Sequence, residues 1–385
     1  MSAFNAMGIA GKQWDVVVIG GGPAGAIAAY VLAQAGRHVL LVDATKSGQP
    51  KVGESLPSAA RRILQKLNLL NLVETGPHIR SYGNASAWGS HELVNTDFIR
   101  DPYGLGWHLD RPRFDADLRL AAQNMGVRYL QGQVETIDVD GEDWQVTLKE
   151  GASKEKTLCQ SRWLIDATGR RAFVARNQGC KRVRDAPLVA IYTWMQQAGS
   201  PDTRTMVETV RNGWWYTALL PSQRRIVALH VDAEDAAPLL NTPGLWMAEL
   251  QKTHYIRHVI SSNEQANSCL PDEYEPAILQ ATDACGARLS SFVGKRWVAV
   301  GDAALSFDPL SSQGIFNALY TGMKCGEAVH AALNGQSGLL HAYTTQLEEI
   351  RTAYLRHYQQ FYQSEQRWSG HSFWSRRHRR KSVIV

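Results

Sequence analysis

The stretch DVVVIGGGPAGAIAA, residues 15–29, decides the fold of this chain. Its β-branched run VVVI predicts a short strand that is buried on both faces. The glycines that follow have the spacing Gly20-x-Gly22-x-x-Gly25, and the alanine-rich residues after them predict a helix. A strand that turns tightly into a helix presents free backbone N–H groups and the positive end of the helix dipole. We therefore expect this turn to hold the pyrophosphate of a dinucleotide.

Each glycine of the turn has a separate physical role. Gly20 allows the tight bend, Gly22 lets the backbone approach the phosphates, and Gly25 lets the helix pack closely on the strand. A second buried strand at 38–43 ends in Asp43. This acid lies about 20 residues farther on, where a carboxylate can accept hydrogen bonds from the ribose hydroxyls. Two more residues of the turn complete this part of the expected cofactor site: Pro23 and Ala24.

Later segments predict further strands and two helices. Strand-like runs recur at 127–131, 133–139, 143–149 and 162–166. Alternating apolar and polar residues from 187 to 231 predict antiparallel strands. The run 296–300 predicts one more buried strand, with a helix from about Gly314. Aromatic and aliphatic residues three or four apart over 338–366, from Tyr343 to Phe361, predict a long helix with one packed face.

The composition of the 385 residues excludes several classes of protein. With 44% hydrophobic and 20% charged residues, the chain is typical of a globular protein. No apolar run reaches the roughly 18 residues that span a membrane, and the first residues lack a secretory signal, so we expect a cytoplasmic protein. Five scattered cysteines without a CxxC pair predict neither disulfides nor a metal site. Much of the net charge of +5 lies near the C-terminus, so nucleic acid is not an expected partner.

Two later segments favour FAD over NAD as the dinucleotide. The strand at 163–166 ends in small residues that would contact the dinucleotide: Ala167, Thr168 and Gly169. The strand before Gly301 and Asp302 ends in an acid suited to the ribityl hydroxyls. The helix start that follows can stabilise negative charge on a reduced flavin, and it would contribute Pro309, Gly314 and Ile315. A GxGxxG start with a late Gly-Asp segment resembles the FAD proteins of the p-hydroxybenzoate hydroxylase fold.

The expected fold class is therefore α/β. A Rossmann-type FAD-binding domain is interleaved with an antiparallel-sheet substrate domain and followed by a C-terminal helical segment. The expected ranges are 14–80, 110–180 and 286–335 for the discontinuous FAD-binding domain, 81–109 and 181–285 for the substrate domain, and 336–385 for the C-terminal helix and basic tail.

Two further motifs narrow the resemblance. KVGESLP at 51–57 and DRPRFD at 110–115 resemble segments of the flavin-dependent tryptophan halogenase-like superfamily. This resemblance implies that three residues of the motifs contact FAD: Gly53, Ser55 and Arg111. The loop also contains two candidate catalytic residues. Glu54 can act as a base or hydrogen-bond anchor, or can simply cap the loop, and Lys51 can lie near the flavin ring or face solvent.

Halogenation is disfavoured by the same resemblance. It implies a lysine beyond that loop, and the stretch from Ala59 to Trp88 offers only Lys66. The family's E-P-L-E-S segment reads DPLS at 308–311, without the second acid. The W-x-W-x-I-P signature is absent, because the matching region reads GWWYTALLP at 213–221.

The GWWY strand and a C-terminal aromatic and basic segment resemble flavoproteins that mature tryptophylquinone enzymes. The resemblance implies an FAD-dependent monooxygenase that hydroxylates a tryptophan side chain of a quinone-enzyme precursor protein. Trp215 and Tyr216 would then contact the substrate, although core packing is an equal alternative for each. Two other functions stay open: hydroxylation of a free aromatic metabolite, and a reductase similar to geranylgeranyl reductases. A second GxGxxG is absent, so we expect electrons from a partner flavin reductase or directly from NAD(P)H.

The C-terminal segment is a candidate docking surface for an acidic partner. It combines aromatic residues that we expect to be exposed with a run of cations: Trp368, Phe373 and Trp374 with Arg376, Arg377, Arg379, Arg380 and Lys381. The alternative is a frayed, solvated tail. His108 and His230 lie in strand-like segments, and we expect both to be structural.

Overall fold

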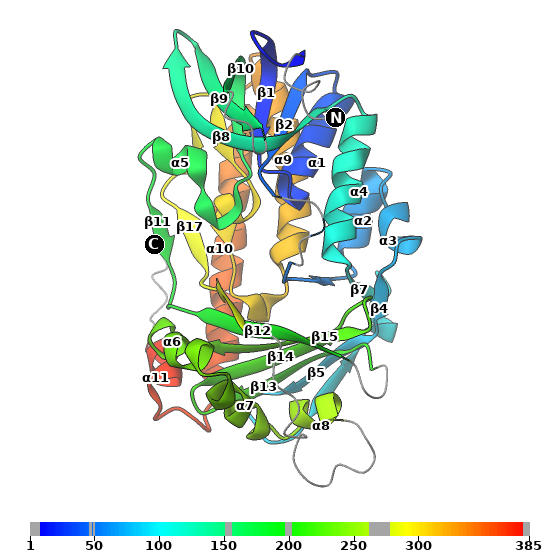
Figure 1. Cartoon of the computed structure of the whole chain (residues 1–385), viewed down its shortest axis with the longest axis vertical. Helices are drawn as coiled ribbons and strands as arrows, with labels where there is room; N and C mark the ends of the chain where they lie inside the picture. The colour runs from blue at the N-terminus through cyan, green and yellow to red at the C-terminus, as the bar shows by residue number, and fades with distance from the viewer. Residues whose placement is uncertain are drawn as a thin grey trace.

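The computed structural model describes residues 8–45, 48, 51–150, 156–196, 202–261 and 278–379. Two seven-stranded sheets and two three-stranded sheets form its framework. Figure 1 shows the first large sheet in the upper half, the second across the lower half, and the long helix α10 running between them. The mixed architecture confirms the predicted α/β class, whereas the predicted domain boundaries stay a prediction.

The upper sheet grows from the βαβ unit that opens the chain. β1 pairs in parallel with β2 on one side and with β10 on the other. β2 pairs in parallel with β8, and β10 pairs in parallel with β19. The strands of this sheet are β1 (Gln13–Ile19), β2 (Val39–Asp43), β8 (Arg128–Asp140), β9 (Asp143–Glu150), β10 (Lys156–Asp166), β18 (Val293–Gly294) and β19 (Trp297–Ala299). The runs predicted at 127–131 and 133–139 are one strand, β8, with an irregularity between Val134 and Thr136.

Three helices pack together beside this sheet. α1 lies between α9 and α4 and contacts both, and its residues from Pro23 to Leu32 are all buried. The helices are α1 (Pro23–Gln34), α4 (Arg111–Asn124) and α9 (Gly314–Leu333). The predicted start of a helix at Gly314 is therefore confirmed. Because α1 and α9 both begin at the same edge of the sheet, their N-termini face the space between the two halves (Figure 1).

The lower sheet is antiparallel except for one parallel pair, β13 with β5. Its strands, in spatial order, are β16 (Gln280–Asp283), β12 (Val189–Gln196), β15 (Arg224–Val231), β14 (Gly213–Leu219), β13 (Thr205–Val210), β5 (Gly83–Ala87) and β6 (Val94–Asp97). Three short helices cover its outer face: α6 (Ala233–Asn241), α7 (Pro243–Gln251) and α8 (Ile256–Ser261). The antiparallel strands predicted at 187–231 are thus present, and successive side chains along them point to opposite faces of the sheet.

Two small sheets and short helices join the halves. One sheet is built from β3 (Ser55–Leu56), β7 (Gly106–His108) and β4 (Ile79–Ser81), and the other from β11 (Arg182–Arg184), β17 (Ala287–Leu289) and β20 (Leu305–Ser306). The helices are α2 (Ala60–Lys66), α3 (Asn71–Glu74) and α5 (Phe173–Asn177). None of the helices in the described part of the chain is long and apolar enough to cross a membrane.

The long C-terminal helix α10 (Gly338–Ser364) packs on α9, as its periodicity predicts. Its buried face includes Tyr343, Leu347, Tyr354 and Tyr358. Phe361, which we expected on this face, is 58% exposed, and Tyr362 is buried in its place. Tyr362 lies four residues after Tyr358 and continues the buried face of the helix.

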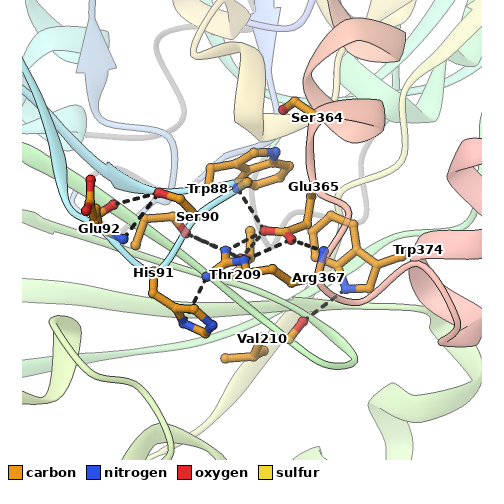
Figure 2. Close-up of polar contacts among 12 residues, drawn as sticks. Trp88, Ser90, His91, Glu92, Thr209, Val210, Ser364, Glu365, Arg367 and Trp374 are labelled. Carbon is orange, nitrogen blue, oxygen red and sulfur yellow. Dashed lines mark hydrogen bonds and ion pairs between the residues drawn. The ribbon is translucent and has the colours of Figure 1, made fainter.

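The C-terminal segment packs on the lower sheet, and the predicted exposure is wrong for three members of the expected docking surface, Phe373, Trp374 and Arg377. Phe373 and Trp374, on α11 (Ser372–His378), are fully buried, and the Trp374 indole donates to the Val210 carbonyl at 3.0 Å (Figure 2). Arg377 is also fully buried, with Nη1 2.8 Å from Oδ1 of Asp232. A buried carboxylate needs such a cation, so the arginine is a structural partner. Of the other predicted cations, Arg376 binds the same carboxylate and Arg379 is exposed, while Arg380 and Lys381 lie outside the described residues.

Candidate functional site

A cavity of about 520 Å³ lies between the two halves of the molecule. Its upper wall contains Gly22, Pro23 and Ala24 of the phosphate turn, together with Gly53, Glu54, Ser55, Arg111, Ala167, Gly169, Asp302, Pro309, Gly314 and Ile315. Its lower wall comes from the antiparallel sheet and contains Ala190, Tyr192, Tyr216, Ile226, Ala228 and His230. Most of the expected cofactor contacts, which are far apart in the sequence, therefore meet in one space.

The three glycines of the phosphate turn differ in the space around them. A Cβ on Gly20, whose φ is +112°, would lie 2.1 Å from the Ala167 carbonyl oxygen. A Cβ on Gly25 would lie 1.9 Å from the Gly20 carbonyl oxygen. A Cβ on Gly22 would meet nothing within 4 Å, because this residue borders the cavity. Gly20 and Gly25 thus hold strand and helix together, and Gly22 leaves room for a ligand at the start of α1.

Asp43 ends β2 beside this turn and has one carboxylate oxygen in need of a donor. Its Oδ1 accepts from the Thr45 N–H at 3.1 Å. Its Oδ2 is buried and accepts no hydrogen bond from the described residues, although Arg119 Nη1 lies 3.5 Å away. A buried carboxylate oxygen left in this way is costly unless a donor reaches it. A ribose hydroxyl of a dinucleotide would supply that donor, so the position fits the expected group.

Two of the expected contacts support the site from behind rather than line it. The Thr168 hydroxyl donates to Oδ1 of buried Asp166 at 2.6 Å, and so anchors the turn after β10. Gly301, at φ +58°, packs against α1, because a Cβ there would lie 2.8 Å from the Ala24 Cβ. Their neighbours Ala167, Gly169 and Asp302 reach the cavity instead. Thr168 and Gly301 therefore contact other residues of the chain, whereas we predicted that they contact FAD directly.

The segment before α9 brings a helix N-terminus and a buried acid to the cavity. Gly314 and Ile315 open this 20-residue helix, and no side chain caps its first N–H groups. Asp308 also lines the cavity, and its carboxylate accepts from the Tyr362 hydroxyl and the Leu310 N–H, each at 2.9 Å. Burial raises the pKa of Asp308 to about 6. The free N–H groups can stabilise negative charge on a bound flavin ring.

Glu54 is a buried acid of the upper wall that binds a residue of the lower wall. It is 3% exposed, and its Oε2 accepts from the Gly53 N–H at 3.0 Å. Its Oε1 shares a hydrogen bond with the hydroxyl of Tyr216, which belongs to the lower sheet. Burial raises the pKa of Glu54 above its ordinary value. The pair thus joins the two halves of the molecule across the cavity.

Lys51 does not occupy the position expected of a catalytic residue. Its Nζ lies 2.9 Å from Oδ2 of Asp115, and it is absent from the cavity wall. Arg111 binds the same carboxylate, with Nε 3.2 Å from Oδ1. Asp115 is buried, so the two cations neutralise it and hold the loop against α4. Asp115 is a residue that our reading of the 110–115 motif did not single out.

Trp215 faces away from the cavity, so its predicted substrate contact is wrong. Its indole packs on Trp246 of α7, with ring centroids 4.9 Å apart. Successive side chains of a strand point to opposite faces, so Tyr216 reaches the cavity and Trp215 cannot. The same period of two would have identified the missed residues of the lower wall, which alternate along β12 and β15: Ala190, Tyr192, Ile226, Ala228 and His230.

His230 is a buried histidine of the lower wall with a lowered pKa. Its ring stacks on the Trp214 indole with centroids 3.6 Å apart, and burial lowers its pKa to about 3. The imidazole is therefore neutral near pH 7. It borders the cavity as an uncharged, flat part of the wall.

A second cavity, of about 670 Å³, lies near the turn between β13 and β14. Its wall includes Arg367, which binds the buried carboxylate of Glu365 (Figure 2). Glu208 accepts from the backbone N–H groups of Tyr255 and Ile256, each at 3.0 Å. Lys252 pairs with Glu249. These charges are thus already matched within the protein.

The family model described as FAD binding domain matches residues 13–357. The chain belongs to the FAD binding domain family. The match includes both walls of the first cavity, so FAD is the dinucleotide that the phosphate turn, Asp43 and Asp302 would hold. This flavoprotein is an FAD-dependent oxidoreductase of the group that contains halogenases and hydroxylases.

Individual relatives extend along nearly the whole flavoprotein. LodB of Marinomonas mediterranea, named as an FAD-dependent oxidoreductase, is 29% identical over 376 residues, covering 95% of this chain and 97% of its own. The myxobacterial chondrochloren halogenase CndH has the same fold, with a TM-score of 0.85 and 22% identity over 97% of this chain and 87% of that one. The peptidyl tryptophan dihydroxylase QhpG, essential for tryptophylquinone cofactor biogenesis, has a TM-score of 0.75 and 24% identity over 95% and 78%.

Proposed function

We propose that this flavoprotein is an FAD-dependent monooxygenase that hydroxylates a tryptophan side chain of a precursor protein during the biogenesis of a quinone cofactor. The observation that carries the proposal is the composition of the cavity. One side of it offers the FAD cradle with Glu54 beside it, and the other offers a largely apolar wall whose Tyr216 hydroxyl binds Glu54. Such a wall suits an uncharged aromatic ring.

The residues have separable tasks in this reaction. Bound and reduced FAD supplies the activation of dioxygen for transfer to an aromatic carbon. Ala190, Ile226 and Ala228 exclude water from the ring of the substrate. Glu54 and Tyr216 offer hydrogen bonds that orient the substrate, and the free N–H groups at the start of α9 would stabilise negative charge on a bound flavin.

The names of two relatives support the choice of substrate. QhpG acts on a peptidyl tryptophan, and LodB is named as an oxidoreductase rather than as a halogenase. Halogenases share the fold, so the residues that line the cavity must decide between halogenation and hydroxylation. No lysine is present among the described residues that line it. Lys66, the candidate in the sequence, pairs with Glu327 on the surface, with Nζ 2.8 Å from the carboxylate.

Mass spectrometry of a modified precursor tests the proposal. The FAD-loaded protein is incubated with the precursor of a tryptophylquinone oxidase, NADH, a flavin reductase and labelled dioxygen, with chloride and bromide present. We expect one or two labelled oxygen atoms on a tryptophan of the precursor. Incorporation of halogen would support a halogenase instead. An unmodified precursor together with hydroxylation of a free indole or phenol would overturn the protein substrate and favour a metabolite.

The source of electrons is proposed as a partner flavin reductase. A control without the reductase but with NADH or NADPH separates this from direct reduction. Flavin bleaching under anaerobic conditions in that control would show that the bound FAD accepts hydride from NADH or NADPH without a reductase.

A further inference from the structure

β16 is an edge strand of the lower sheet that borders the first cavity. It pairs with β12 on one side, and no strand of the described residues pairs with it on the other. Gln280 and Ala281 are exposed, while Thr282 and Asp283 belong to the cavity wall. β6, at the opposite edge of the same sheet, contributes nothing to that wall. An open strand edge therefore lies beside the space that holds the substrate in the proposed reaction.

The register with β12 determines which backbone groups of β16 face outward. Just after the strand, the Ala284 N–H donates to the Leu188 carbonyl oxygen at 2.9 Å. In an antiparallel pair, residues that bond to the neighbouring strand alternate with residues that do not. The residues two and four positions before Ala284 therefore also bond to β12, and the N–H and C=O groups of Ala281 and Asp283 point to the far side. A backbone placed alongside can pair with them.

The side chains of β16 show which face of an added strand would meet the cavity. The Tyr192 hydroxyl of β12, a residue of the cavity wall, donates to Oε1 of Gln280 at 3.0 Å. Side chains two residues apart share a face, so Thr282 lies on this side, and it lines the cavity too. On an added strand, the side chain opposite Thr282 would share this face, about 4.8 Å farther out. An aromatic ring at that position can extend into the cavity.

β16 lacks the features that usually protect an edge strand. Natural edges carry lysine, proline or a bulge that discourages pairing with another chain. β16 contains no lysine or proline, and its register with β12 has no shift. Its one charge, on Asp283, is matched by Arg184, with Oδ2 3.1 Å from Nη2. Ile278, just before the strand, is 69% exposed. The occupant that fits this edge is an extended polypeptide with apolar side chains.

We propose that β16 docks the protein substrate, with an extended segment of the precursor pairing alongside it as an added strand and the reacting tryptophan opposite Thr282. This inference rests on the proposed function, because it states how the precursor is held. Main-chain hydrogen bonds supply affinity in such strand addition. The alternation of side chains supplies selectivity, because the residues on either side of the tryptophan point away from the cavity.

Proline at position 281 tests the docking. Ala281→Pro removes the outward N–H and leaves the bonds to β12 intact, since an edge strand tolerates proline where its N–H faces outward. We expect the FAD-loaded variant to bind a fluorescently labelled precursor of a tryptophylquinone oxidase about tenfold more weakly than wild type, as loss of one hydrogen bond predicts. Ala281→Val keeps the N–H and should bind more tightly than Ala281→Pro. The ratio of FAD to protein checks that each variant is folded.

Asn95→Pro, on β6, is the matched control at the other edge. The Phe98 N–H donates to the Tyr82 carbonyl oxygen at 2.8 Å, so the same alternation turns the N–H of exposed Asn95 outward. Its proline variant should bind the precursor as wild type does. Equal affinities of Ala281→Pro and Asn95→Pro would overturn the docking site.

Hydrogen exchange measured by mass spectrometry gives a second readout on the unaltered, FAD-loaded protein. The amides of β16 should exchange more slowly once the precursor is bound, whereas those of β6 should not change. Unchanged exchange at β16 in the complex would overturn the proposal and leave hydroxylation intact, because neither measurement involves oxygen transfer. A dimer that Ala281→Pro converts to monomer, with precursor binding retained, would assign the edge to a second copy of this chain instead. A precursor that protects β16 but gains no oxygen would contradict the proposed function alone.

Discussion

At the scale of single residues, the site depends on which way neighbouring side chains point. Tyr216 and Trp215 are adjacent on β14, yet one reaches Glu54 in the cavity and the other packs on Trp246 of α7. Both are large aromatics in the same motif, and composition cannot separate them. Their opposite faces follow from the two-residue period of a strand.

This difference predicts different phenotypes for two similar substitutions. Tyr216→Phe removes the hydroxyl that binds Glu54, so turnover should fall about tenfold or more while FAD content and stability change little. Trp215→Phe leaves a gap against Trp246, so the free energy of unfolding should fall by about 1–3 kcal/mol with catalysis per folded molecule retained. Chemical denaturation and oxygen-transfer assays on both variants measure this. Equal loss of activity in the two would contradict the assignment of faces.

At the scale of elements, the start of α1 illustrates how one turn serves both packing and binding. Gly20 and Gly25 sit against backbone carbonyl oxygens, whereas Gly22 borders the cavity. Two glycines are therefore required for the fold of the βαβ unit, and one is required for the ligand. The spacing of the motif alone shows that all three matter but not that their tasks differ.

A matched pair of alanine substitutions separates these tasks. Gly25→Ala places a methyl group 1.9 Å from the Gly20 oxygen, so the strand and helix must move apart, and we expect a loss of several kcal/mol of stability or no folded protein. Gly22→Ala has free space, so the apoprotein should keep its melting temperature, but FAD affinity should fall about tenfold or more because the methyl group crowds the phosphates. Differential scanning fluorimetry with and without FAD gives both quantities. Wild-type FAD affinity in Gly22→Ala would contradict the pyrophosphate position.

At the scale of the whole molecule, the C-terminal segment ties the chain together. α10 passes from the upper half to the lower, and α11 then places Arg377 against Asp232 just after β15 (Figure 1). Both side chains of this ion pair are fully buried. Phe373, Trp374 and Arg377, which we expected on a docking surface, therefore stabilise the lower half of the molecule from inside.

Removal of this cation should destabilise the flavoprotein. Arg377→Met leaves Asp232 with Arg376 as its remaining cation, and loss of a buried partner costs about 3–5 kcal/mol. Adding Asp232→Asn should restore part of that loss, since it removes the buried charge. Arg379→Ala, at an exposed position of the same segment, is the control and should be neutral. Guanidinium denaturation of the four proteins checks this, and a neutral Arg377→Met would contradict a structural role.

The sequence by itself determined the βαβ unit, the fold class and the cofactor. Its signals are local: a β-branched run, three glycines at fixed spacing and an acid at the end of the next strand, each with a direct physical requirement. The glycine-rich turn and the late Gly-Asp segment therefore identified FAD, and most residues predicted to contact it line one cavity.

Only the tertiary structure decided which candidates share the cavity. Lys51 pairs with Asp115, Trp215 lies behind the sheet, and Arg377 closes a buried ion pair. The physical reason is that the roles of a charge or a ring depend on partners distant in sequence, and burial forces each charge to find one. The bond between Glu54 and Tyr216 is of the same kind, because one residue lies in the loop before β3 and the other on β14, and no local pattern connects them.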